Sequence, residues 1–148
     1  DLRMSRGLGD VYKRQLNILH NNHYAYGRTG ICGTRGWIND GSEEGDKKVI
    51  LREAGRLEAS VSSAEKAGLD PVVFLHYPPI FGAGCNYDML EVLHRHNIKW
   101  CFYGHIHGRG HEFAINGERE GINYRLISSD FLQFDPMDIT KIVQSDNL

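Results

Sequence analysis

The chain has 148 residues, a length that suits a single domain. Hydrophobic residues make up 41% and charged residues 24%, and the formal net charge is -2, so the composition is that of an ordinary globular protein. This charge balance argues against a nucleic-acid-binding module, which needs a basic surface to neutralise phosphates. No apolar run approaches the roughly 20 residues of a membrane-spanning helix. We therefore expect neither a nucleic-acid partner nor a membrane partner.

The cysteines indicate a reducing compartment. Cys32, Cys85 and Cys101 are odd in number and lack the spacing of a metal site. We expect them to be small core or near-core side chains in a cytoplasmic protein.

The first fifteen residues differ from the rest of the chain. They show no clear hydrophobic period, and the run Asp10-Val11-Tyr12-Lys13-Arg14-Gln15 looks like a translated sequencing adaptor. We predict that residues 1–15 are an artefact and that 16–148 are a partial domain that begins in mid-domain.

The first predicted elements after residue 15 are two short strands, over 24–26 and 31–33, separated by a glycine-bounded turn. A polar loop over 36–46 leads into a long helix over 46–67. The helix is indicated by one apolar stripe at four- and three-residue steps, made of Ile50, Ala54, Leu57, Val61 and Ala64. Residues 72–75 form a continuous apolar run that suits a strand buried on both faces, and the prolines at 78 and 79 end it.

A second unit repeats this plan. Asn86 can cap a helix that runs to about residue 96, and residues 99–103 predict another buried strand. A strand-helix-strand connection of this length implies parallel strands. Further strands are expected over 122–128 and 139–143. The predicted fold class is α/β.

Histidines follow two of these strands. His76 comes directly after the strand at 72–75, and His105 and His107 follow the strand at 99–103. Ligands in open α/β sheets bind outside the carboxyl ends of the strands. In extended backbone the i, i+2 spacing puts both side chains on one face, about 6.6 Å apart at Cα. The three imidazoles are therefore predicted to hold metal, either one ion or two ions about 3.5–4 Å apart.

Imidazole suits zinc, iron, nickel and copper, whereas manganese usually needs added carboxylates. A hydrolytic dinuclear site also needs a bridging carboxylate. The chain contains no Asp-x-His motif to supply one. From its residues alone, the sequence predicts half of a metal site.

These residues resemble a known family. Gly104-His105-Ile106-His107 is similar to the closing Gly-His-x-His motif of the calcineurin-like metallophosphoesterases, and His76 before Tyr77-Pro78-Pro79 looks like that family's isolated metal-binding histidine. The run Cys32-Gly33-Thr34-Arg35-Gly36-Trp37 is similar to small bacterial members. The resemblance covers roughly residues 16–134. It implies the C-terminal part of a four-layer α/β/β/α sandwich.

The resemblance also implies roles and a reaction. His76 and His105 would bind the second of two divalent or trivalent metal ions (Mn, Zn, Fe or Ni), and His107 would bind the first. A hydroxide bridging the two metals would attack the phosphorus of a small phosphoester. The family's Asp-x-His, Gly-Asp-x-x-Asp and Gly-Asn-His motifs are missing from this chain, and with them the bridging aspartate and the expected catalytic histidine. We therefore expect the chain itself to be inactive.

The remaining candidates have simpler interpretations. Arg35 is a candidate phosphate contact, since guanidinium matches phosphate geometry, but a surface arginine is as good an interpretation. His94 and His96 are predicted to point to different faces of a helix and to be solvated. His111 is predicted to be a loop residue. His20 and His23 are predicted to lie at strand edges.

Two other functions remain open. His105-x-His107 followed by Glu112 matches the metal ligands of a mononuclear cupin, but cupins are all-β barrels and the helix at 46–67 contradicts that fold. The second alternative is a non-catalytic metal-binding or binding-only module that keeps the fold without the chemistry. Metal content separates the three.

Overall fold

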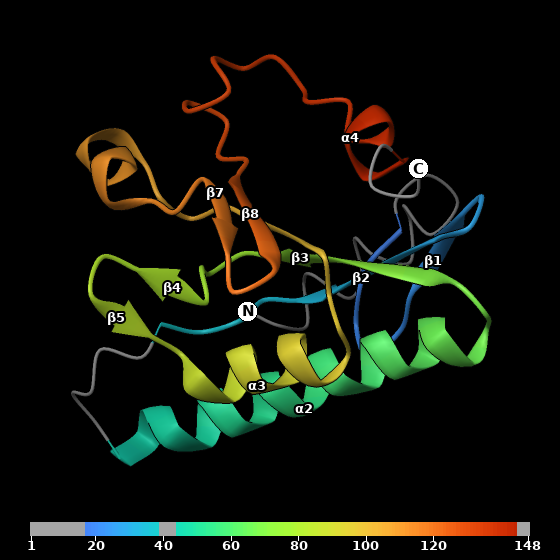
Figure 1. The fold of residues 1–148 in the computed structure, drawn as a ribbon. Coiled ribbons are helices and arrows are strands. Elements are labelled where there is room, and N and C mark those ends of the chain that lie inside the picture. The colour runs from blue at the N-terminus through green and yellow to red at the C-terminus, as the bar shows by residue number, and fades with distance from the viewer. Residues whose placement is uncertain (1–16, 39–43, 145–148) are drawn as a thin grey trace, which may run out of the picture.

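The structure of the protein is a computed structural model that describes residues 17–38 and 44–144. The adaptor prediction for residues 1–15 lies outside the described residues. Figure 1 shows one large sheet with two helices packed along one side. The strands are β1 (Tyr24–Tyr26), β2 (Thr29–Thr34), β3 (Asp70–Leu75), β4 (Ile80–Phe81), β5 (Gly84–Cys85), β6 (Trp100–Tyr103), β7 (Gly117–Arg119) and β8 (Ile122–Leu126). The α-helices are α2 (Glu44–Lys66), α3 (Tyr87–Arg95) and α4 (Thr140–Gln144), and a 3-10 helix, η1, spans Gly108–Phe113.

The large sheet has six strands in the order β1-β2-β3-β6-β8-β7. Its four central strands run parallel, and the outer strands β1 and β7 are antiparallel to their neighbours. Strands β4 and β5 form a separate hairpin. The α/β class and the parallel arrangement predicted from the sequence are confirmed. The four-layer sandwich remains a prediction.

One face of the sheet is covered by α2 and α3, as Figure 1 shows. The predicted stripe of α2, from Ile50 to Ala64, is buried throughout. From Ala54 to Ala64 the stripe packs with Met89, Val92 and Leu93 of α3 in the main core. The helix comes so close to β2 that a Cβ on Gly30 would lie 2.7 Å from the Cβ of Ala64. This close contact explains why β2 carries glycine at that position.

The opposite face of the sheet carries a smaller core. Phe74, Trp100 and Phe102 stack there, with ring centroids 5.1 Å apart for the two phenylalanines and 5.8 Å for Trp100 and Phe102. The C-terminal segment packs against them through Met137, Ile139, Ile142 and Val143.

The strand predicted over 139–143 is wrong, because the segment forms α4. The apolar residues Ile139, Ile142 and Val143 are spaced at three and four residues, as a helix requires. The side chain of Asp138 accepts a hydrogen bond of 3.0 Å from the backbone N–H of Thr140, which favours helix initiation at this point.

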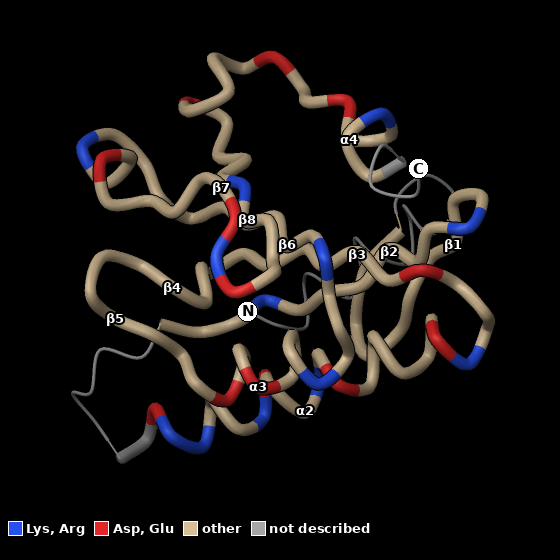
Figure 2. The backbone as a smooth tube through the Cα atoms, in the orientation of Figure 1, with Lys and Arg blue, Asp and Glu red and all other residues tan. Residues whose placement is uncertain are grey.

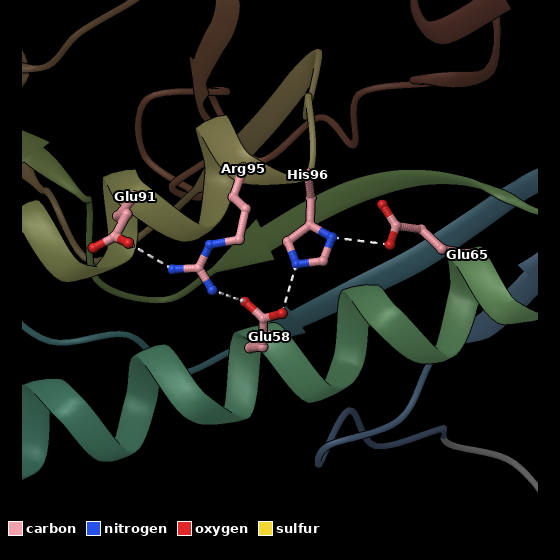
Figure 3. A network of polar contacts seen from close by, with 5 residues as sticks. All are labelled: Glu58, Glu65, Glu91, Arg95 and His96. Atoms are coloured by element: carbon pink, nitrogen blue, oxygen red, sulfur yellow. Dashed lines mark hydrogen bonds and ion pairs between the residues drawn. The ribbon is translucent and has the colours of Figure 1, made fainter.

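Charged side chains join α2 to α3. Figure 2 shows acidic and basic residues interspersed along these helices, and Figure 3 shows the contacts between them. His96 bonds Glu58 through Nε2 at 2.8 Å and Glu65 through Nδ1 at 2.9 Å. Arg95 bonds Glu58 at 3.0 Å and Glu91 at 2.7 Å. We call these five residues the interhelical clamp.

The cysteines have the expected structural role. Cys32 and Cys101 are buried and Cys85 is half-buried, and all three are free thiols. Burial raises the pKa of Cys32 to about 11, so its thiol stays protonated at neutral pH. In the described residues, no helix is both long and apolar enough to cross a lipid bilayer.

Candidate metal centre

The candidate centre lies where two neighbouring parallel strands end. His76 follows β3 directly, and His105 follows β6 after one glycine. The strand register pairs Leu75 with Tyr103, so the two strands end level with each other. The backbone N–H of Gly104 donates to the carbonyls of Leu75 and His76, at 3.2 Å each. These bonds hold the two histidine-bearing loops side by side.

The side chains of His76 and His105 meet. Nδ1 of His105 lies 3.1 Å from Nε2 of His76, and the ring planes are inclined by 71°. Partial burial lowers the pKa of His105, and the neighbouring His76 and His107 lower it further. His105 is therefore neutral at neutral pH, which is the form that binds metal.

The separation of these two nitrogens can be compared with that in a metal site. Two nitrogens bound to one zinc at about 2.0–2.1 Å and a tetrahedral angle lie about 3.4 Å apart. The spacing of 3.1 Å is a few tenths of an ångström shorter. His76 and His105 therefore fit two positions on one ion, with a small outward movement.

The backbone at His105 differs from the sequence prediction. His105 has φ +69°, and the N–H of Ile106 bonds the carbonyl of Gly104 at 2.8 Å, which is a γ-turn. The extended backbone assumed for 105–107 is therefore wrong at its first residue. The turn bends the chain sharply after β6 and directs His105 to His76. His107 itself is extended, with φ -130°.

His107 pairs with a carboxylate. Its Nδ1 lies 2.7 Å from Oδ1 of Asp130, a residue in the loop after β8. Oδ2 of Asp130 accepts the N–H of Gly108 at 2.9 Å and lies 3.3 Å from Nε2 of His111. The hydrogen bond from Gly108, opposed by partial desolvation but aided by His107 and His111, holds the pKa of Asp130 well below its usual range. Asp130 is therefore ionised and can only accept hydrogen bonds.

The fit to metal is partial. His76 and His105 suit one ion, whereas in residues 17–38 and 44–144 no group of three or more His, Cys, Asp or Glu side chains is arranged to hold a metal. The chain has an Asp-x-x-Asp run at Asp135 and Asp138, but no glycine precedes it. Asp138 also bonds Thr140 at the start of α4. These carboxylates therefore do not supply the bridging aspartate that the resemblance would require.

Arg35 lies in the loop that precedes the centre. Its carbonyl accepts the N–H groups of His76 and Tyr77, at 3.1 and 2.8 Å. Its guanidinium stacks over Trp37, 4.7 Å from the ring centroid. Trp37 contacts Tyr77, and Tyr77 lies 4.2 Å from the ring centroid of His105. Ring contacts therefore connect Arg35 through Trp37 and Tyr77 to His105. A phosphate-binding role for Arg35 remains a prediction.

The other histidines lie away from this pair. The prediction for His96 is wrong: only 11% of its side chain is exposed, because it inserts between two glutamates of α2. His94 is 40% exposed, as a solvated residue should be. His111 lies in η1 instead of an irregular loop. His23 precedes β1 and bonds Ser63, and His20 lies in a bend.

Asp130 was missed in the sequence. It follows β8, the last in chain order of the four parallel strands that end at this edge of the sheet. Its place in the sequence could have indicated it, because a carboxylate shortly after a predicted parallel strand lies at the edge of the sheet where ligands bind.

Comparisons with models of protein families, with curated proteins and with solved structures find no match to this chain.

Proposed function

We propose that this chain supplies the histidine half of the metal centre in a metal-dependent phosphoesterase of the calcineurin-like type, within the four-layer fold of that family. The observation that supports this best is the meeting of His76 and His105 at the ends of adjacent parallel strands, 3.1 Å apart. The neutral state of His105 and the presence of His107 in the same loop agree with it.

The residues of the chain have separate tasks in this proposal. His76 and His105 bind one ion through Nε2 and Nδ1, the atoms that already face each other. His107 offers its remaining nitrogen, Nε2, because Nδ1 is engaged by Asp130. When bound, metal would polarise the phosphate and lower the pKa of a water. Arg35 is placed to contact the phosphate of a small substrate if its guanidinium leaves Trp37.

A binding-only module is the second candidate. It is favoured by the partial fit described above, since no third ligand joins His76 and His105 in the described residues. A mononuclear cupin is not retained, because the parallel sheet with its helices contradicts an all-β barrel.

The test joins this chain to the N-terminal half of a calcineurin-like phosphoesterase, which carries the Asp-x-His, Gly-Asp-x-x-Asp and Gly-Asn-His motifs. We expect Mn²⁺- or Zn²⁺-dependent hydrolysis of p-nitrophenyl phosphate. His107→Ala should remove most of it, and the matched control His94→Ala should leave it intact. A joined, folded protein that binds metal but cleaves neither aryl monoesters nor diesters would favour the binding module. Activity indifferent to His107→Ala would overturn the site.

A further inference from the structure

We propose that Asp130 is a positioning residue for the metal centre: it holds the proton of His107 on Nδ1 and so reserves Nε2 for a metal ion. The proposal rests on the metal-binding role proposed above for His107. It adds a residue to that site for which the Gly-His-x-His pattern gives no signal.

The contacts of Asp130 fix its carboxylate on several sides. Oδ1 faces Nδ1 of His107 at 2.7 Å and accepts the N–H of Phe131 at 3.0 Å. Oδ2 accepts the N–H of Gly108 at 2.9 Å and lies 3.3 Å from Nε2 of His111. The carboxylate therefore joins the loop after β8 to the start of η1. It touches three residues of the segment that begins with His107.

The direction of the hydrogen bond follows from chemistry. A carboxylate that accepts two backbone N–H groups is an acceptor, so the facing nitrogen of His107 must be the donor. When the imidazole of His107 carries a single proton, the contact with Asp130 places that proton on Nδ1. Nε2 is then left with its lone pair available.

The hydrogen bond to Asp130 is the main restraint on the ring of His107. About 60% of the His107 side chain is exposed, so packing restrains the ring little. By contrast, His105 contacts the rings of His76 and Tyr77. Metal-binding histidines commonly donate their second ring N–H to a carboxylate, which fixes the tautomer and orients the ring. Asp130 has the position and charge for that task.

The first readout needs no metal. Proton–nitrogen correlation spectra of the histidine rings, recorded on the 148-residue chain at about pH 8 where ordinary histidines are neutral, show which nitrogen is protonated. We expect the Nδ1–H form for His107 in the unmodified chain. Asp130→Ala should convert it to the Nε2–H form. Asp130→Asn should keep Nδ1–H, because the amide oxygen can still accept.

The second readout is Zn²⁺ affinity, measured by titration calorimetry. We expect Asp130→Ala to weaken binding by about 10–100-fold, the usual effect of removing such a partner. The matched control is Asp135→Ala, which removes an exposed carboxylate from the same segment and should change neither readout.

The outcomes separate the two proposals. An Nε2–H tautomer of His107 in the unmodified chain, or an unchanged tautomer in Asp130→Ala, would overturn the role of Asp130. Loss of zinc binding in Asp130→Ala with an unchanged tautomer would make Asp130 a ligand and also overturn it. If the unmodified chain binds no zinc, the metal role of His107 fails. The tautomer of His107 still decides whether Asp130 positions it.

Discussion

The interhelical clamp gives a prediction whose size depends on pH. Each ring nitrogen of His96 faces a different carboxylate, so both must carry protons for both contacts to be favourable. Partial burial opposes protonation, but hydrogen bonds to Glu58 and Glu65 and their negative charges outweigh it and raise the pKa of His96. The perturbation is His96→Ala, which removes both contacts.

The magnitude follows from the exposure of the partners. A hydrogen bond to a charged group contributes about 1.5–3 kcal/mol when buried, and an exposed ion pair contributes about 0.2–1 kcal/mol. The side chain of His96 is 11% exposed, but Glu58 and Glu65 are 35% and 39% exposed. We therefore expect His96→Ala to lower the free energy of unfolding by about 1–2 kcal/mol at about pH 6. Arg95 continues to join Glu58 to α3 in the variant.

The pH dependence has one direction. Because the folded pKa of His96 lies above its unfolded value of about 6.5, the stabilisation is fully present below pH 6.5 and is lost as the pH rises through the folded pKa. Urea unfolding of the unmodified chain and of His96→Ala, at several values between about pH 6 and 9, measures the difference. High salt should reduce it.

The control is His94→Ala, since the side chain of His94 pairs with the 82% exposed Glu120, at 3.3 Å. It should change stability by less than about 0.5 kcal/mol at every pH. A destabilisation by His96→Ala that stays constant or grows as the pH rises would refute the doubly protonated clamp.

Three further predictions follow from packing and from the incomplete site. Gly33→Ala should be severely destabilising, because its Cβ would lie 2.0 Å from the carbonyl oxygen of Phe74. The control Gly55→Ala lies in exposed helix, where the new Cβ meets nothing within 4 Å, and should raise the free energy of unfolding by about 0.5–1 kcal/mol. Thermal melts compare the two variants, and a tolerated Gly33→Ala would refute the close approach. Asn86→Ala should lower the free energy of unfolding by about 1–3 kcal/mol in urea unfolding, because the residue is 2% exposed, caps α3 and donates to the carbonyl of Trp37 at 2.9 Å. Asn86→Ser, whose hydroxyl can still accept at the cap, should cost less, and equal losses would contradict the cap. The 148-residue chain alone should not hydrolyse p-nitrophenyl phosphate above background with added Mn²⁺ or Zn²⁺. Two metal ions so close together repel each other unless a carboxylate bridges them, and the proposed site has no such carboxylate among the described residues. Robust turnover would contradict this prediction.

Much of the fold could be predicted because local and global signals agree. The apolar stripe of α2, from Ile50 to Ala64, spans about four helical turns, which is long enough for its period to distinguish a helix from a strand, and every one of its predicted members is buried. Asn86 caps α3 as expected, through a bond of 3.2 Å from Met89. The apolar runs before His76 and His105 form adjacent parallel strands, because both are buried on two faces.

The failures occur where a nonlocal contact or a few residues decide the structure. Residues 139–143 are too short for hydrophobic period to separate strand from helix, and the bond from Thr140 to Asp138 favours the helix. The γ-turn at His105 requires a positive φ that glycine would normally carry, yet glycine occupies the preceding position. Asp130 and the partners of His96 come from segments distant in sequence, so no local pattern brings them together.

The proposed function depends on His76 and His105 binding a metal ion together. Zinc titration calorimetry of the 148-residue chain, with His76→Ala, His105→Ala and the control His94→Ala, measures whether they do. We expect one bound zinc in the unmodified chain and in His94→Ala. The affinity should be at least about tenfold lower in each of the other two variants, because loss of even an outer partner has that effect. Zinc binding that is absent, or that survives both substitutions unchanged, would contradict it.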